Sequence, residues 1–544
     1  MRFVRLLIVM SLLPALTAQD TAQLARTGQR ALGDNAYTTA VYFLKQAVTA
    51  DPRHPSAWKD LCRAYLDLDQ IEAAIDACLK QIDVHPESPG VYVALGRAYW
   101  RKAKRDEAIS AFQQQIEVDP KNGAAHANLG RLYRELGRYA DAVPELEKAV
   151  AMQPETVDRA GLGGAYLDLG QTDKGWEVLT KLAQDTPSPG TWNIVAYALA
   201  SHKLQLDRAQ QYAESAVTMV VTNLRNVELD HITVVDLRRV VSLATYWDTL
   251  GWVYFEKGNP DEAQKFIAAA WSLNPRGAIG DHLGQIYASR GQKQEATHAY
   301  SMALASRDAL PETRHRLDAL LAPGEAAPDV NEHVRIVLAG KLFSEQATAD
   351  FYVMQPQKPA QAAARFIRGD DRLRLFTKAV QEITPRGIFP DATPTQLIRR
   401  VTLSCPGEGR ECSIALPPAT DAVIAELNSI PPNTQFANET FPRKPGSYNI
   451  DAGVTPPVVI YKVDPAYSKE ASKKKIQGTI TLDFVVDPTG HPRDIEVIRG
   501  LGYGLDEKAI EAVGKWQFRP GTKDGEPVGT HATVEVNFRL LKDH

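Results

Sequence analysis

The sequence of 544 residues contains no apolar stretch long enough to cross a bilayer. Its most apolar stretch, residues 6–18, has 13 residues and is interrupted by Pro14, whereas a membrane-spanning helix needs about 20. Arg2 and Arg5 precede this stretch, and Ala18 offers a small residue for cleavage, which is typical of an export signal. We therefore predict a signal peptide at residues 1–18, a periplasmic or cell-envelope location, and no stable membrane span. An uncleaved anchor helix is the alternative.

An excess of charge of one sign is also missing. Lys and Arg total 62 and Asp and Glu total 66, which gives a formal net charge of -4. A general nucleic-acid binder normally carries a basic excess. We therefore expect no nucleic-acid partner.

Familiar catalytic motifs are absent as well. The sequence has neither a Gly-x-Ser-x-Gly elbow nor a His-Glu-x-x-His metal helix. Gly500, Gly502 and Gly504 lie between an expected strand and helix, but a dinucleotide site needs a parallel strand–helix–strand unit and an acidic residue further on. Here the strand belongs to a hairpin, so we predict a tight turn. We expect no enzymatic activity, cofactor or metal; an enzyme with its site at 330–427 is the alternative.

Cysteine is scarce, with four residues. Cys405 and Cys412 flank a glycine-containing turn between two expected strands, where a disulfide closes easily in an oxidising compartment. The spacing does not fit a paired-cysteine zinc site, so we predict a disulfide, with free thiols as the alternative. For Cys62 and Cys78 the sequence leaves two readings open, a second disulfide or two buried small side chains.

Against these absences stands a strong repeat of 34 residues. Small residues recur in phase with prolines that close each block. The prolines are Pro52, Pro86, Pro120 and Pro154, and the small residues are Gly28, Cys62, Gly96 and Gly130, followed by Ala40, Ala74, Ala108 and Ala142. Small residues let two helices approach closely, and proline ends the second helix.

This pattern resembles the tetratricopeptide repeat, a pair of helices that stacks with its neighbours into a superhelix with a concave binding surface. The pattern is less regular after Pro154 but returns around Trp247 and Leu283. We predict an array over residues 21–321 with an insertion near 218–243.

Arginines recur at the same place of three consecutive repeats. Arg63, Arg97 and Arg131 stand 34 residues apart, at a place that the resemblance assigns to the concave surface. The same wall would hold Lys59, Arg101 and Arg134, with Asp67 and Glu135 offsetting part of the charge. Guanidinium groups suit carboxylates because their planar fork donates two parallel hydrogen bonds. We predict a groove for an acidic segment or a free C-terminus. The alternative is that these arginines are ordinary solvated helix formers.

After a short linker, residues 330–427 show strand-like runs and one amphipathic helix over 371–383. We predict a small mixed α/β domain of unknown type, with strands near 334–338, 349–353, 397–403 and 412–416. Residues 431–457 are rich in Pro, Asn, Gly and Thr, which predicts an extended linker.

Residues 458–544 read as helix, strand hairpin, helix and strand. The residues that make the pattern specific are Leu505, Asp506, Ala509, Trp516, Phe518, Pro520, Val534, Val536 and Phe538. This domain resembles the TonB C-terminal domain. In that family the domain pairs with a short segment of outer-membrane transporters and transmits energy from an inner-membrane motor. The resemblance implies that the last strand, predicted over 528–540, lies at a sheet edge where a partner peptide can add.

Alternation assigns the two faces of that last strand. Val534, Val536, Phe538 and Leu540 should face inward, and the docking edge would carry Thr533, Glu535, Asn537 and Arg539.

Together, the sequence predicts a mainly α repeat array, a small mixed α+β domain and a C-terminal α+β domain. The function that it predicts is an exported, non-catalytic adaptor of the cell envelope that binds protein partners. The alternative is a TonB-type energy transducer to outer-membrane transporters whose N-terminal anchor is not cleaved.

Overall fold

The computed structural model describes residues 18–33, 37–225, 227–306, 308–322, 324–328, 330, 335–357, 362–391, 395–427, 448, 454–473, 475–501, 504–523 and 525–539. The predicted signal peptide, apart from Ala18, and most of the predicted linker at 431–457 lie outside these residues. The chain divides into two compact units, Met1–Gly161 with Glu426–Thr440 and Leu162–Ala425 with Phe441–His544.

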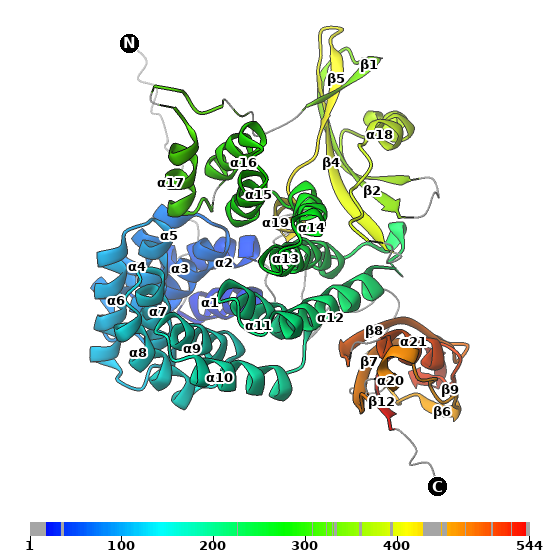
Figure 1. Ribbon diagram of the computed structural model, residues 1–544, viewed down its shortest axis with the longest axis horizontal. Coiled ribbons are helices and arrows are strands. Elements are labelled where there is room, and N and C mark those ends of the chain that lie inside the picture. The colour runs from blue at the N-terminus through cyan, green and yellow to red at the C-terminus, as the bar shows by residue number, and fades with distance from the viewer. Residues whose placement is uncertain are drawn as a thin grey trace, which may run out of the picture. The chain divides into compact units, whose positions relative to one another are not determined.

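The first unit consists of helix hairpins, coloured blue to cyan in Figure 1. Its helices are α1 (Ala18–Gly33), α2 (Tyr37–Ala50), α3 (Ala57–Asp67), α4 (Ile71–Val84), α5 (Val91–Arg101), α6 (Arg105–Val118), α7 (Gly123–Glu135) and α8 (Tyr139–Met152). Each odd-numbered helix packs on the next helix in the chain, and α1, α3, α5 and α7 also contact one another in sequence. The first helices of successive repeats are therefore neighbours.

A small residue in the first helix lets each pair approach closely. A Cβ atom at Gly28 would lie 2.5 Å from Cγ of Leu44, and one at Gly130 would lie 2.7 Å from Cγ of Leu146. Both distances are far below van der Waals contact, so a larger residue at either glycine would push the two helices apart. The recurrence of small residues thus has a direct packing cause.

In the second repeat, two cysteines occupy this contact. Cys62 and Cys78 form a disulfide with a Cα–Cα distance of 5.3 Å and a sequence separation of 16. Gly28 and Leu44 are also 16 residues apart. A covalent bond therefore replaces the small-on-large contact at the same place of the repeat, and of the two readings left open by the sequence the structure has the disulfide.

The second unit begins with further helix hairpins. They are formed by α9 (Thr156–Asp168, which runs across the division), α10 (Thr172–Asp185), α11 (Pro189–Ser201), α12 (Leu206–Arg225), α13 (Val234–Glu256), α14 (Pro260–Leu273), α15 (Gly277–Ser289), α16 (Lys293–Ala305) and α17 (Pro311–Leu320). The small-on-large contact recurs at Gly251 beneath Ile267 and at Gly284 beneath Tyr300.

The predicted insertion near 218–243 does not form a separate element. Its first part lengthens α12 to 20 residues and its last part lengthens α13 to 23 residues. Between them lies a short 3-10 helix, η1 (Leu229–His231). Thr233 and Asp236 then form a reciprocal capping box at the start of α13, so the insertion is two helix extensions joined by a capped turn.

The middle domain is a five-stranded antiparallel sheet (Figure 1). Its elements are β1 (Ile336–Leu342), β2 (Gln346–Pro356), β3 (Ala363–Gly369), η2 (Asp371–Phe376), α18 (Thr377–Ile383), β4 (Gln396–Pro406), β5 (Glu411–Ala415) and α19 (Ala419–Leu427), and the strand order is β1-β5-β4-β2-β3. Strand β3 and helix α19 were not predicted from the sequence. The single helix expected over 371–383 is a 3-10 turn followed by α18. Cys405 and Cys412 form a disulfide that closes the β4–β5 turn.

The C-terminal domain has a central three-stranded antiparallel sheet with the order β12-β7-β8. Its elements are β6 (Val458–Tyr461), α20 (Lys469–Lys473), β7 (Gly478–Val486), β8 (Pro492–Arg499), α21 (Leu505–Val513), β9 (Gln517–Arg519), β10 (Gly521–Lys523), β11 (Glu526–Val528) and β12 (Thr530–Phe538). Helix α21 packs on β7 and β8, and Gly504, with φ 74°, makes the tight turn before it. The predicted order of repeat array, mixed domain and C-terminal α+β domain is confirmed.

Two boundaries at the end of the chain differ from the prediction. The last strand is not continuous over 528–540, because Val528 pairs with Gly521 in the β10–β11 hairpin and the ladder with β7 starts at Thr530. Two residues assigned to the linker also pair with this domain, Tyr448 with Thr530 and Val454 with Lys523. Leu540 lies outside the described residues.

A buried ion pair ties α13 to α15. Nδ1 of His282 lies 2.9 Å from Oδ1 of Asp248, and the Trp252 ring stacks on the imidazole with the ring centroids 4.3 Å apart. Burial lowers the pKa of His282, but the Asp248 carboxylate and the nearby Asp281 outweigh it, so the pKa of His282 is raised.

This raised pKa predicts how the pair stabilises the fold. Protonated His282 contributes stability that is fully present below its unfolded pKa of about 6.5 and is lost as the pH rises through the higher folded value. An NMR titration of the imidazole should show His282 titrating above that value. An Asp248→Asn variant should titrate lower than wild type, because it loses the main raising group while burial remains. A wild-type His282 that titrates at or below the unfolded value would contradict this assignment.

Candidate partner-binding surfaces

The six predicted groove residues lie on three neighbouring helices. Each helix carries two of them: Lys59 and Arg63 on α3, Arg97 and Arg101 on α5, and Arg131 and Arg134 on α7. Because these helices contact one another in order, the 34-residue spacing places Arg63, Arg97 and Arg131 side by side. We call these three residues the arginine ladder.

The centre of the ladder is Arg97. Burial among neighbouring side chains lowers the pKa of Arg97, and the positive charges of Arg101, Arg131 and Arg63 lower it further, while Asp67 opposes them. Within the described ranges, neither Arg97 nor Arg63 has a hydrogen bond or an ion pair within 4 Å. Both side chains still reach solvent, although the surrounding helices partly desolvate the Arg97 guanidinium. Two accessible guanidinium groups are thus held close to like charge, an arrangement that suits an external anion.

The other groove residues already have partners in the chain. Arg131 donates to Oδ1 of Asn128 at 3.2 Å, and its Nε lies 3.9 Å from Asp158. The Lys59 ammonium donates to the carbonyl of Pro89 at 3.3 Å.

Arg101 donates to the carbonyl of Leu66 and lies 3.8 Å from Asp69. Arg134 is half-buried and is also engaged. The six residues are therefore not equivalent, and Arg63 and Arg97 are the ones available to a ligand.

An acidic residue stands within the ladder. Burial raises the pKa of Asp67, although Arg97, Arg101 and Arg63 act in the opposite direction. Its carboxylate offsets part of the positive charge of these arginines, as the sequence predicted. A bound anion would have to compete with this carboxylate for the guanidinium groups.

The second surface is the outer edge of β12, on the side away from β7. The register pairs β12 with β7 from Thr530 to Phe538 without a shift, so backbone groups alternate regularly between β7 and the outside. The His531 N–H donates at 2.9 Å to the carbonyl of Tyr448, which lies on the outer side. The N–H and C=O groups of Thr533, Glu535 and Asn537 therefore point outward too.

Side chains on β12 follow the predicted faces. Val536 and Phe538 are buried, Val534 is half-buried, and Thr533, Glu535 and Asn537 are exposed. Oδ1 of Asn537 accepts a hydrogen bond from Thr479 of β7 at 2.6 Å. Arg539 is exposed but lies beyond the end of the strand. Beyond Tyr448, no described residue pairs with the outer backbone of β12.

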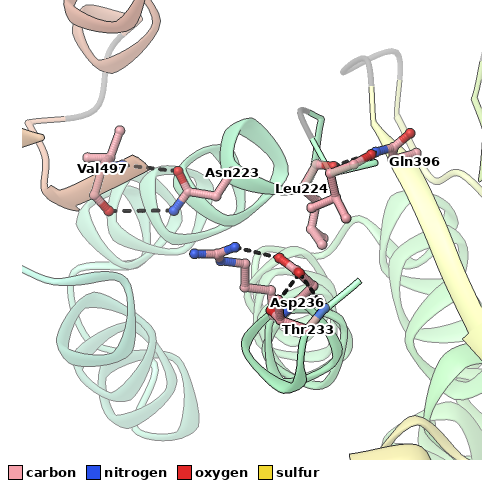
Figure 2. Close-up of polar contacts among 8 residues, drawn as sticks. Asn223, Leu224, Thr233, Asp236, Gln396 and Val497 are labelled. Carbon is pink, nitrogen blue, oxygen red and sulfur yellow. Dashed lines mark hydrogen bonds and ion pairs between the residues drawn. The ribbon is translucent and has the colours of Figure 1, made fainter. Parts of the chain in front are cut away.

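The opposite edge of this sheet, β8, is covered at one point by a helix of the same unit. The Asn223 amide of α12 accepts from the Val497 N–H at 3.1 Å and donates to the Val497 carbonyl at 3.5 Å (Figure 2). Thr222 donates to Glu507 of α21 at 3.2 Å. A side-chain amide thus takes the place of a neighbouring strand at β8.

The same end of α12 also binds the middle domain. Nε2 of Gln396 donates to the carbonyls of Leu224 at 2.8 Å and Val227 at 2.6 Å (Figure 2). Leu224 lies in the last turn of α12 and its carbonyl also accepts from the Val227 N–H at 3.2 Å, so Gln396 adds a side-chain donor at this helix end. Sequence reasoning missed Asn223 and Gln396, and the only available signal was the insertion itself, whose Val- and Leu-rich run is too apolar for a surface loop.

The described parts of the chain contain neither a cluster of metal ligands nor a membrane-spanning helix. Within them, no group of three His, Cys, Asp or Glu side chains could hold a metal ion, and no helix combines the length and apolar character of a membrane span.

Comparisons with family models match both halves of the chain. The tetratricopeptide repeat matches residues 31–89, 93–155 and 244–276, and the Gram-negative bacterial TonB protein C-terminal matches residues 463–540.

Among curated proteins, Protein TonB of Vibrio cholerae serotype O1 is 31% identical over 86 residues, which cover 16% of this chain and 35% of that protein. Protein TonB of Klebsiella pneumoniae is 26% identical over 132 residues, covering 24% of this chain and 51% of that protein. The chain thus spans between a third and about half of the length of these relatives.

Among solved structures, MamA matches with 22% identity and a TM-score of 0.28 over 31% of this chain and 92% of that chain. A tetratricopeptide repeat protein from Parabacteroides merdae matches with 14% identity and a TM-score of 0.37 over 56% of this chain and 100% of that chain. The chain thus contains tetratricopeptide repeats and, at residues 463–540, a TonB C-terminal domain.

Proposed function

We propose that this protein is an exported, non-catalytic adaptor of the cell envelope with two separate protein-binding surfaces. The arginine ladder binds one partner, and β12 accepts a strand from a second partner in the periplasm or the outer membrane. The repeats support a role in protein–protein interaction, and the C-terminal domain supports a role at the envelope.

The observation that carries this proposal is the outer backbone of β12. Three alternate residues, Thr533, Glu535 and Asn537, present N–H and C=O groups that β7 does not use. An extended peptide can satisfy these groups by adding as a strand. The other edge is less accessible, because Asn223 already takes both backbone groups of Val497.

The arginine ladder favours a partner that carries a carboxylate. Arg63 and Arg97 supply planar donors that have no hydrogen bond or ion pair among the described residues, and charge-assisted hydrogen bonds to a carboxylate are among the stronger ones. We infer that the groove accepts an acidic segment or a free C-terminus.

A second candidate function is a TonB-type energy transducer to outer-membrane transporters, held in the inner membrane by an uncleaved N-terminus. The similarity of residues 463–540 to TonB proteins favours it. The two candidates differ in the fate of the first 18 residues.

The N-terminus separates these candidates. The adaptor predicts a mature chain that starts near Gln19 and fractionates with soluble periplasmic proteins, because the signal at 1–18 has been removed. N-terminal mass spectrometry of each cell fraction measures this. Recovery of intact Met1 in washed inner membranes would favour the transducer instead.

The groove is tested by removing its central guanidinium. Arg97→Ala should weaken binding of a peptide with an acidic, free C-terminus by about 1–3 kcal/mol, because a charged hydrogen bond is lost. Fluorescence anisotropy over a salt series should also show affinity falling as salt rises.

Arg138→Ala is the matched control, since Arg138 is exposed on the same unit but pairs with Asp141 at 2.8 Å. A folded Arg63→Ala/Arg97→Ala/Arg131→Ala variant that binds as tightly as wild type, at all salt concentrations, would eliminate the groove.

The β12 edge is tested with proline. Asn537→Pro removes an outward N–H that β7 does not use, so the domain should stay folded while strand addition is strongly weakened. Quantitative mass spectrometry of outer-membrane and periplasmic proteins that co-purify with the full chain measures the loss, and circular dichroism verifies folding.

Asn537→Ala is the control for this edge, because it removes the same side chain and keeps the N–H. Partners retained equally by folded Asn537→Pro and Asn537→Ala variants would rule out strand addition at β12.

A further inference from the structure

One half-buried arginine of the middle domain lacks a counter-ion among the described residues. Arg399 lies on β4, opposite Val353 of β2, and its Nη2 donates to the Ser272 hydroxyl of α14 at 3.3 Å. Its Nε is buried and has no hydrogen-bond partner. Among the described residues, no carboxylate forms an ion pair with Arg399.

The next residue in the strand differs in having a counter-ion, although its Nε is also buried without a hydrogen-bond partner. Arg400 lies 2.5 Å from the Asp350 carboxylate, and Arg368 lies 3.2 Å from the same carboxylate. Asp350 thus forms ion pairs with two other arginines and none with Arg399.

Burial without a neighbouring anion changes the pKa of Arg399. Burial alone lowers the pKa of Arg399 to about 10, so the guanidinium is still charged at neutral pH. An unpaired buried charge is costly, and proteins normally neutralise it with a partner or a ligand.

A small cavity adjoins this guanidinium. It has a volume of about 70 Å³ and is bounded by β4, by α13 and α14, and by the start of α19. Its polar lining comprises Ser272, Arg399 and Arg400, the last of which is already paired with Asp350. Leu237, Leu273 and Ile398 are among its apolar walls.

The first turn of α19 also favours an anion in this cavity. Ala419 and Ala422 line the cavity, and the start of a helix carries a partial positive charge that favours anions. The Thr420 N–H already bonds to Asn274 at 3.2 Å, and Asp421 lies in the same turn without lining the cavity. The guanidinium is therefore the main donor and the helix a supporting one.

We propose that this cavity is a binding site for a small oxyanion, a carboxylate or a phosphate group, which Arg399 and Ser272 hold. The site is separate from the arginine ladder and from β12, and it does not depend on the proposed adaptor function. The bound anion would neutralise Arg399 where the middle domain packs on α13 and α14.

Isothermal titration calorimetry on the full chain tests this site. Inorganic phosphate and acetate are titrated separately, at an ionic strength held constant with sodium chloride. We expect saturable binding of at least one of the two anions at one site per chain, and the stronger one identifies the source of the oxyanion. Arg399→Met should weaken this binding at least tenfold.

Two further variants make the test specific. Arg399→Met should remain folded, because replacing an unpaired buried charge with an apolar side chain is often neutral or stabilising. If it does not fold, Arg399→Lys, which keeps the charge but loses the planar fork, should weaken binding instead. Arg410→Met, at an exposed arginine that pairs with Glu408 at 3.5 Å, should bind as wild type. Absence of saturable binding, or equal binding by the folded Arg399 variants, would overturn the proposal.

Discussion

The repeat array depends on one contact, a small residue of the first helix beneath a large residue of the second. Gly28 beneath Leu44 and Gly130 beneath Leu146 leave no room for an added methyl group. The Cys62–Cys78 disulfide holds the same place in the second repeat. This contact sets how each hairpin closes, and therefore also the orientation of the first helices. Residues that recur every 34 positions then lie in a row on neighbouring helices.

The second constraint is that the unpaired backbone N–H and C=O groups at a sheet edge must be covered or paired. The C-terminal sheet has two edges, and the chain treats them differently. At β8, the Asn223 amide takes the place of a strand, whereas Tyr448 is the one described residue that pairs with the outer side of β12, near its start. This asymmetry leaves one extended stretch of backbone for a partner. The extension of α12 makes these contacts possible, because its last turn contacts the C-terminal domain and, through Gln396, the middle domain.

Local patterns in the sequence were enough to predict the repeats, the neighbouring arginines and the faces of β12, because each depends on a fixed spacing. They were not enough for Asn223, whose partner Val497 is 274 residues away, since no local rule selects one polar residue of an apolar run as a contact. Strand β3 was missed for a related reason: its residues are all half-buried or exposed, so they lack the alternation that reveals a strand with one buried face. The lone charge of Arg399 was equally invisible, because the sequence does not show which carboxylates lie near it in the fold.

The central claim, two surfaces for two different partners, is tested most directly by site-specific photo-crosslinking in the native cell. A photoreactive amino acid is placed at position 97 in one variant and at position 537 in another, with position 138 as the control. The account predicts that each of the first two positions captures its own distinct protein and that the control captures neither. Capture of one and the same protein at both positions, or no capture at either, would contradict it.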